Sequence, residues 1–148
     1  MSTVVPPKFF GEQFASDVIR RERQKILVLR ETATSHTWAK LIKNETASCL
    51  QAGLRSLFSQ VRPPNAARSA TCRLDNAPAF QSLALNNSLK DIGVKLDLAN
   101  AANINSNPVA EKANRELEKD IITCQPSGGK ITNQVLATAV AMLNARSR

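Results

Sequence analysis

Apolar and polar residues alternate along the first third of the chain in the manner of β-strands. Residues 12–22, EQFASDVIRRE, alternate between two faces and predict a strand. Residues 25–34, KILVLRETAT, are rich in branched aliphatic side chains and predict a second, more buried strand, and residues 36–42, HTWAKLI, predict a third. Because the connections are short, these segments predict an antiparallel meander. Residues 1–11 contain two adjacent prolines and are expected to be an irregular lead-in.

The rest of the chain changes to a helical period that short strands interrupt. Leucines recur at helical spacing within residues 44–61, where Asn44 and Thr46 are candidate N-caps. The elements expected after it are a strand at 70–75, a turn and short helical segment at 76–93 closed by Gly93, a fifth strand at 94–100, a helix at 108–124, a turn at 125–130 and a last helix at 131–148 with an apolar stripe of Val135, Ala139 and Met142. This order predicts one α/β domain, residues 12–148, with a five-stranded mixed sheet flanked by helices.

The composition favours a folded domain with a polyanionic partner. The chain has 148 residues, of which 43% are hydrophobic, so that it can bury a core and does not have the composition of a disordered protein. Lys and Arg outnumber Asp and Glu by 20 to 12, which gives a formal net charge of +8. The simplest partner for such a charge is nucleic acid.

Several other classes of protein do not fit the sequence. No apolar run approaches the roughly 18 residues that span a bilayer, and the N-terminus does not have the pattern of a signal peptide. The three cysteines, Cys49, Cys72 and Cys124, are too far apart for a zinc pattern and are expected to be small buried residues in a reducing compartment. The single histidine, His36, is expected to be a polar residue at a strand end, since a metal site would need partners that are missing.

Three of the twelve acidic residues stand out by their placement, whereas the other nine are expected to be solvated surface charges. Asp17 lies between apolar residues inside a strand, where it could also face water. Asp75 ends the strand at 70–75, where α/β sheets tend to place ligand sites, although an Asx turn would also explain it. Glu111 lies in the first turn of a helix, where the helix dipole would favour a carboxylate. With Asn107 as N-cap it occupies position N4, whereas the glutamate of a capping box occupies N3, so capping does not explain it.

Together these three carboxylates predict a metal site. Carboxylate oxygens are ligands that Mg²⁺ prefers, and a few of them leave positions for water and phosphate. Two such ions a few ångströms apart activate an attacking oxygen and stabilise a leaving one in phosphoryl transfer.

The spacing of the three acids resembles the DDE triad of retroviral and LTR-retrotransposon integrases. Thirty-five residues lie between Asp75 and Glu111, and 57 between Asp17 and Asp75. The stretch RLDNAPAF resembles the segment around the second acid of that family, and NSNPVAEKANRELEKDI resembles the helix around the third. The resemblance covers the chain from about residue 12 onward. It implies an RNase H-like fold, two Mg²⁺ ions that Mn²⁺ can replace, and DNA as the substrate.

The same resemblance implies a DNA-binding face on the helix at 108–124. Steps of four residues advance about 40° around a helix, so Glu111, Arg115 and Lys119 share one face. Asn114 lies beside Glu111, and Lys112 lies about 100° away and ranks lower. Solvated charges on an exposed helix remain the alternative explanation. Residues 100–107 resemble the flexible catalytic loop of the family.

Two departures from the family pattern qualify the resemblance. The His₂Cys₂ zinc domain and the SH3-like domain of many integrases have no counterpart here, which predicts a catalytic core alone. Ala77 stands where many retroviral members have glycine, which is expected to stiffen that turn.

The sequence as a whole predicts an integrase core that carries out 3′-end processing and strand transfer of element DNA. It is expected to form a homodimer or higher oligomer through its first and last helices, and to act in the nucleus or in a cytoplasmic element particle before nuclear entry. The alternatives are a non-catalytic DNA-binding or dimerisation module, an inactive retroelement remnant, and a nuclease of the same fold that cuts RNA in hybrids.

Overall fold

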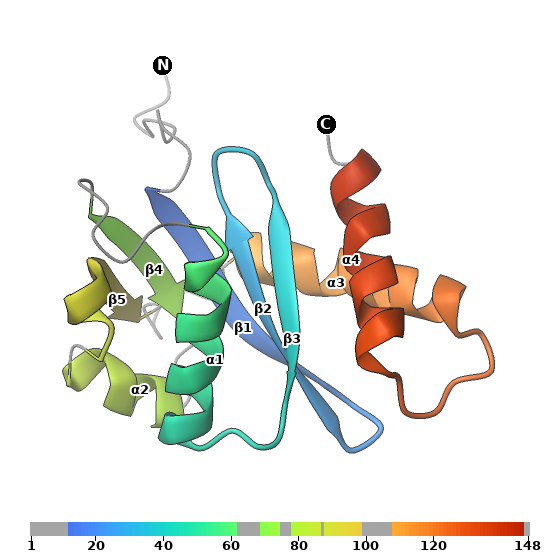
Figure 1. The fold of residues 1–148 in the computed structure, drawn as a ribbon, viewed down its shortest axis with the longest axis horizontal. Coiled ribbons are helices and arrows are strands. Elements are labelled where there is room, and N and C mark those ends of the chain that lie inside the picture. Colours follow the sequence, from blue (N-terminus) through green and yellow to red (C-terminus); the bar gives the residue numbers. More distant parts are fainter. Residues whose placement is uncertain (1–11, 62–68, 75–77, 87, 99–107, 147–148) are drawn as a thin grey trace.

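A five-stranded mixed sheet forms the centre of the molecule (Figure 1) in a computed structural model that describes residues 12–61, 69–74, 78–86, 88–98 and 108–146. The side chains of residues 108–111, 113 and 146 lie outside that description. The strands are β1 (Gln13–Arg21), β2 (Gln24–Glu31), β3 (Thr37–Ile42), β4 (Ala70–Leu74) and β5 (Val94–Leu98). Their order in the sheet is β3-β2-β1-β4-β5. The first three strands pair antiparallel, and β4 and β5 continue the sheet in parallel with β1, which confirms the predicted meander and mixed sheet.

Helices cover the sheet from two sides. They are α1 (Ala47–Ser59), α2 (Pro78–Leu85), the short 3₁₀ helix η1 (Lys90–Ile92), α3 (Pro108–Cys124) and α4 (Asn133–Arg146). α1 packs on β2 and β3, and α2 packs on β5. On the other side α3 packs on β1 and β2, and α4 packs beside α3 and on β3 (Figure 1). Among the described helices, none combines the length and the apolar composition that a bilayer span requires.

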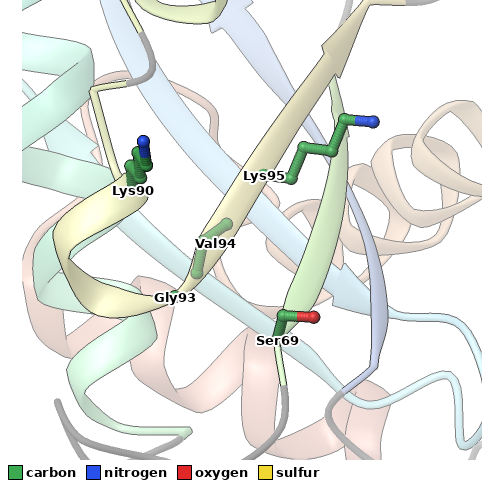
Figure 2. A pocket seen from close by; sticks show the side chains of 5 residues that line it. All are labelled: Ser69, Lys90, Gly93, Val94 and Lys95. Carbon is green, nitrogen blue, oxygen red and sulfur yellow. The ribbon is translucent and has the colours of Figure 1, made fainter.

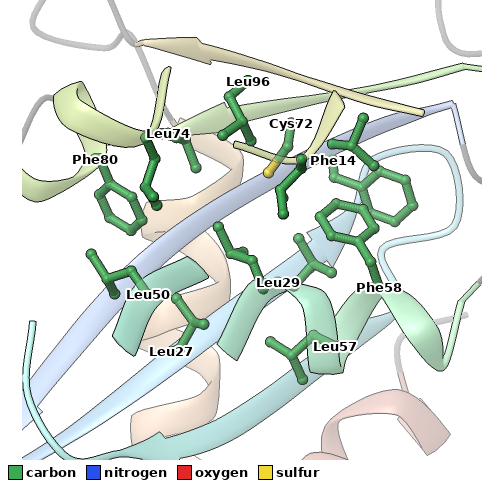
Figure 3. Close-up of a cluster of buried hydrophobic side chains, with 14 of the residues drawn as sticks. Phe14, Leu27, Leu29, Leu50, Leu57, Phe58, Cys72, Leu74, Phe80 and Leu96 are labelled. Atoms are coloured by element: carbon green, nitrogen blue, oxygen red, sulfur yellow. The ribbon is translucent and has the colours of Figure 1, made fainter. Parts of the chain in front are cut away.

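The two faces of β2 explain why the sheet lies between two apolar cores. Leu27 and Leu29 belong to the cluster under α1 and α2, whose side chains are shown in Figure 3. Ile26 and Val28 belong to the second cluster, under α3 and α4. All four are at most 1% exposed. A strand that is buried on both faces requires a continuous apolar run, which the sequence ILVL at residues 26–29 provides.

Local signals in the sequence fix the ends of several elements as predicted. Thr46 is the N-cap of α1, and its hydroxyl accepts a hydrogen bond from the backbone N–H of Cys49. Asn44 in turn accepts hydrogen bonds from the backbone N–H and the hydroxyl of Thr46. Gly93 closes η1 with a left-handed φ of 77°, a conformation that glycine adopts without strain.

The last helix corrects one prediction in part. Its buried residues are Leu136, Ala139 and Leu143, and Val135 is partly buried. Met142 lies beside this face, where its sulfur is 3.5 Å from that of Cys124. Because α4 is apolar on several sides, the helical period alone does not distinguish the stripe with Met142 from the neighbouring one with Leu136 and Leu143. Packing against β3 and α3 determines which stripe is buried.

Five acids that were expected to be solvated are not exposed: two are buried, and Glu12, Glu45 and Glu116 are partly buried. Glu31 and Asp120 are buried, and Glu116 forms an ion pair with the buried Arg30. The Glu31 carboxylate accepts hydrogen bonds from the backbone N–H and the hydroxyl of Thr34, at 2.7 and 2.8 Å. Such partners offset the cost of burying a carboxylate, and a single sequence does not reveal them.

The hairpin between β1 and β2 holds the connection between α3 and α4. The carboxylate of Glu22 accepts a hydrogen bond from the Gly129 N–H at 2.9 Å, and Arg21 donates one to the Gly129 carbonyl. Gln24 exchanges two hydrogen bonds with the backbone of Ile131. The turn itself is strained, because Glu22 and Arg23 both have positive φ, at 46° and 68°.

Replacement of Arg23 by glycine is expected to stabilise the fold. Glycine relieves about 1 kcal/mol of strain from the left-handed backbone conformation. Its greater conformational freedom in the unfolded chain offsets part of this gain, so the free energy of unfolding should rise by about 0.5 kcal/mol. The melting temperature, measured by circular dichroism, should rise by about 2 °C. Arg23→Ala removes the same charge but keeps the Cβ atom, so it should give no gain; an equal gain would show that charge and not strain is responsible.

Candidate active site

Asp17 lies on the face of β1 that α3 covers. Ala15 and Ile19 lie two residues before and after it, so their side chains point to the same side of the sheet. Ile19 belongs to the core under α3 and α4. The side chain is half-buried, and its Oδ1 atom accepts a hydrogen bond of 2.7 Å from the backbone N–H of Val18. Asp17 is therefore not a carboxylate on an open, solvated sheet face.

The packing of α3 brings a second polar side chain to Asp17. Leu117 and Ile121 of α3 are fully buried in the cluster that also contains Ile19 and Val28. One turn before Leu117, the Nδ2 atom of Asn114 donates a hydrogen bond of 3.1 Å to Oδ2 of Asp17. The first part of α3 is thus held over the middle of β1.

This contact also places the backbone of Glu111 near Asp17. Glu111 precedes Asn114 by three residues, which is about 4.5 Å along a helix and nearly one full turn. The two residues therefore lie on neighbouring positions of one helix side, as predicted. The side chain of Glu111 lies outside the described residues.

The third predicted acid is also outside the described part of the chain. β4 is described as far as Leu74, which pairs with Ser16 in the parallel register. Ser16 and Leu74 are the residues that immediately precede Asp17 and Asp75 in the sequence. The candidate catalytic loop at 100–107 and Ala77 are likewise outside the description.

The remaining oxygen of Asn114 is a buried acceptor. Within the described residues, its Oδ1 atom is the buried side-chain polar atom that accepts no hydrogen bond. The amide cannot simply be turned round, because its oxygen would then face the carboxylate of Asp17. The site therefore offers a carboxylate and an amide oxygen beside each other, and both are chemically suited to a cation or a hydrogen-bond donor.

The basic residues of α3 form an exposed surface beside this site. Lys112, Arg115 and Lys119 are all exposed. None of the three forms an ion pair with another described residue. They are thus accessible to an anionic partner, as the prediction of a DNA-binding face requires.

A buried ion pair that the sequence did not reveal fixes α3 to the sheet. Arg30 of β2 is only 4% exposed, and its Nη1 atom lies 2.9 Å from Oε1 of Glu116. Ala15 pairs with Arg30 in the register, so Arg30 lies on the same sheet face as Asp17. The only signal in the sequence was an arginine directly after the apolar run ILVL.

The residues expected to be unrelated to the site have local partners elsewhere. The Nε2 atom of His36 lies 3.3 Å from Nδ2 of Asn144, and its ring lies 4.6 Å from that of Trp38. Cys72 is fully buried, and this burial raises the pKa of its thiol, whereas Cys49 and Cys124 are only half-buried. Among the described residues, no three His, Cys, Asp or Glu side chains are grouped as metal ligands; the carboxylates of Asp75 and Glu111 are not among those residues.

The order of the strands, with an antiparallel meander followed by parallel strands and helices on both faces, defines an RNase H-like α/β fold. Two solved structures that it resembles come from retroviral integrases. The catalytic core domain of BIV integrase superposes with a TM-score of 0.72 and 22% identity, over 92% of this chain and 85% of that one. A chain of the simian T-cell lymphotropic virus intasome, in complex with the PP2A regulatory subunit B56 gamma, gives a TM-score of 0.74 and 17% identity over 93% of this chain.

The present chain spans about half of that second chain, 49% of its length. No protein-family model matches the sequence, and no curated protein does either. The fold of this protein is therefore that of a retroviral integrase catalytic core, as the sequence predicted.

Proposed function

We propose that the protein is the catalytic core of a retroelement integrase, which processes the 3′ ends of element DNA and joins them to target DNA. The observation that carries this proposal is the hydrogen bond from Asn114 to Asp17. It joins the acid of β1 to the helix that carries Glu111, in the fold that integrase cores have. Asp17, Asp75 and Glu111 are the proposed catalytic acids.

The described residues fit a divalent cation at this site. Asp17 supplies carboxylate oxygens, which Mg²⁺ and Mn²⁺ accept as ligands, and Asn114 orients that carboxylate from the side of α3. We propose that Asp75 and Glu111 complete the ligand set. When two such ions are bound, they supply activation of the attacking oxygen and stabilisation of the leaving one.

The proposed activity consists of two phosphoryl transfers. In the first reaction a water oxygen forms a bond to phosphorus near the element end, and the bond from phosphorus to the 3′ oxygen breaks. In the second, the freed 3′-hydroxyl attacks a phosphodiester of the target and displaces another 3′ oxygen. No side chain acts as the nucleophile.

The protein's own residues hold and orient the substrate. The exposed side of α3 binds phosphates through Arg115, Lys119 and, further from the acid, Lys112.

Assembly and location complete the proposal. A homodimer or higher oligomer would use the surfaces of α1 and α4, the first and last helices. Such a complex would act on DNA in the nucleus, after passage through a cytoplasmic element particle.

A disintegration assay on branched DNA tests this function, because it demands least of the DNA-positioning domains that integrases carry outside their cores. The wild-type chain should release product in Mg²⁺ or Mn²⁺ but not in EDTA, and Glu111→Gln should release none while its circular dichroism spectrum is unchanged. Absence of product from the folded wild-type chain in both metals would favour a non-catalytic binding module or an inactive remnant. Preferred cleavage of an RNA–DNA hybrid would favour the nuclease.

A further inference from the structure

The side of β4 and β5 that faces away from α1 and α2 remains exposed and basic. Ala70, Cys72 and Leu74 of β4 are buried in the core under those helices. The residues between them, Thr71 and Arg73, point to the opposite side, since side chains alternate along a strand. In the register Lys95 pairs with Thr71 and Asp97 pairs with Arg73, so these four residues share one face. We call them the β4–β5 face.

This face is continuous with the surface that holds Asp17. Ala15 pairs with Arg73 across the parallel β1–β4 ladder, and Asp17 lies two residues further along β1 on the same side. The backbones of Arg73 and Asp17 are thus separated by one strand spacing, about 4.8 Å, and by a rise of about 6.6 Å. Their direct separation is about 8 Å. Among the described elements, α3 packs on β1 and β2 and α4 packs on β3, so neither of these helices covers the neighbouring face.

The charged groups of the face are available to a ligand. Arg73, Lys95 and Asp97 are all exposed. Although Arg73 and Asp97 face each other in the register, no ion pair joins them within the described part of the chain. Lys90 adds a further cation where β5 begins: it lines a cavity of about 470 Å³ together with Lys95 and Ser69. Figure 2 shows Lys90 and Lys95 on the two sides of the first residues of β5.

We propose that the β4–β5 face, with Lys90 at its edge, binds the sugar–phosphate backbone of the DNA strand that leads into the active site. Three cations and one acid give this surface a formal charge of +2, which is complementary to phosphate. Arg73 is the contact nearest to the catalytic acids, because it precedes Asp75 by two residues and lies one strand from Asp17. The face has few apolar groups, so it fits a hydrated, charged backbone better than an apolar peptide or helix. This inference rests on the proposed function.

Salt-dependent binding tests the proposal without requiring catalysis. The full chain is titrated into a fluorescein-labelled DNA duplex in EDTA, and fluorescence anisotropy gives the affinity at several KCl concentrations. The test variant is Arg73→Gln/Lys95→Gln. The control, Lys40→Gln/Lys43→Gln, removes the same charge at the other edge of the sheet, where Lys40 is an exposed residue of β3 and Lys43 follows that strand.

The two variants should differ in the slope of log affinity against log salt. Each lost phosphate contact reduces the slope by about 0.9, so the test variant should lose about 2 and the control nearly nothing. Asp97→Asn should tighten binding, because it removes the one acid from the face. Equal slopes for test and control variants, or an unchanged slope in the test variant, would overturn the inference. If the wild-type chain does not bind the duplex at all, the proposed function fails with it, whereas normal wild-type binding with unaffected variants overturns this inference alone.

Discussion

Asp17→Asn is expected to reduce disintegration activity by roughly 10³-fold or more while leaving the fold intact. The amide has the same size, and its oxygen can still accept a hydrogen bond from Asn114 or Val18. It has no negative charge, however, and binds a divalent cation poorly. The stabilisation of transition-state charge by a bound metal ion amounts to several kcal/mol, and about 1.4 kcal/mol corresponds to a factor of ten in rate.

The matched control for this substitution is Asp91→Asn. Asp91 is an exposed aspartate in η1, and the guanidinium of Arg55, which donates hydrogen bonds to it, lowers the pKa of its carboxyl. It lies away from α3, so activity should be retained. Initial rates on branched DNA, with the melting temperature of each variant as a measure of folding, provide the comparison. Substantial activity in Asp17→Asn would remove Asp17 from the catalytic set.

The two partners of the buried ion pair should differ in their effect on stability. Glu116→Ala leaves the guanidinium of Arg30 buried without its partner, and we expect it to lower the free energy of unfolding by about 3 kcal/mol. Arg30→Met keeps an apolar stem in the same space, and Glu116, whose side chain is 32% exposed, can turn to water. We expect this second substitution to cost about 1 kcal/mol or less.

A double-mutant cycle by urea denaturation measures this difference. In the Arg30→Met background, Glu116→Ala should cost less than about 1 kcal/mol, because no buried charge remains for it to neutralise. If Glu116→Ala costs the same in both backgrounds, the pair does not hold α3 on the sheet. A substitution that does loosen α3 should also reduce activity, since Asn114 reaches Asp17 from that helix.

Regular patterns made most of the fold predictable from the sequence. β2 was predicted because four consecutive branched aliphatic residues, 26–29, are typical of a strand that is buried on both faces. α3 was predicted at residues 108–124, where the structure has it. Periodicity does not choose between neighbouring stripes of an apolar helix, which is why Met142 was preferred to Leu143 in α4. That choice depends on contacts with β3 and α3, which are distant in the sequence.

The candidate site was predictable only where its residues break a local pattern. Asp17 was recognised because a carboxylate interrupts an apolar strand, and the structure places it against Asn114 of the predicted DNA-binding helix. Glu116 and Asp120 follow the ordinary pattern of a charged helix, so nothing in the sequence distinguishes them from solvated acids. Their burial depends on where α3 crosses β2, and on Arg30, which is 86 residues away from Glu116. The roles of Asp75 and Glu111 remain predictions from spacing and from the family resemblance.

The central claim, that Asp17 holds a catalytic divalent cation beside α3, is tested most directly by adding Mn²⁺ to the isotopically labelled protein and recording NMR spectra. Mn²⁺ broadens the resonances of nearby nuclei. Within the described part of the chain, the backbone N–H of Val18 and the side-chain amide of Asn114 donate hydrogen bonds to Asp17. Their signals should broaden first as Mn²⁺ is added, and Asp17→Asn should abolish the effect. Sharp signals from both amides, with broadening only at other acidic residues, would contradict the assignment of this site.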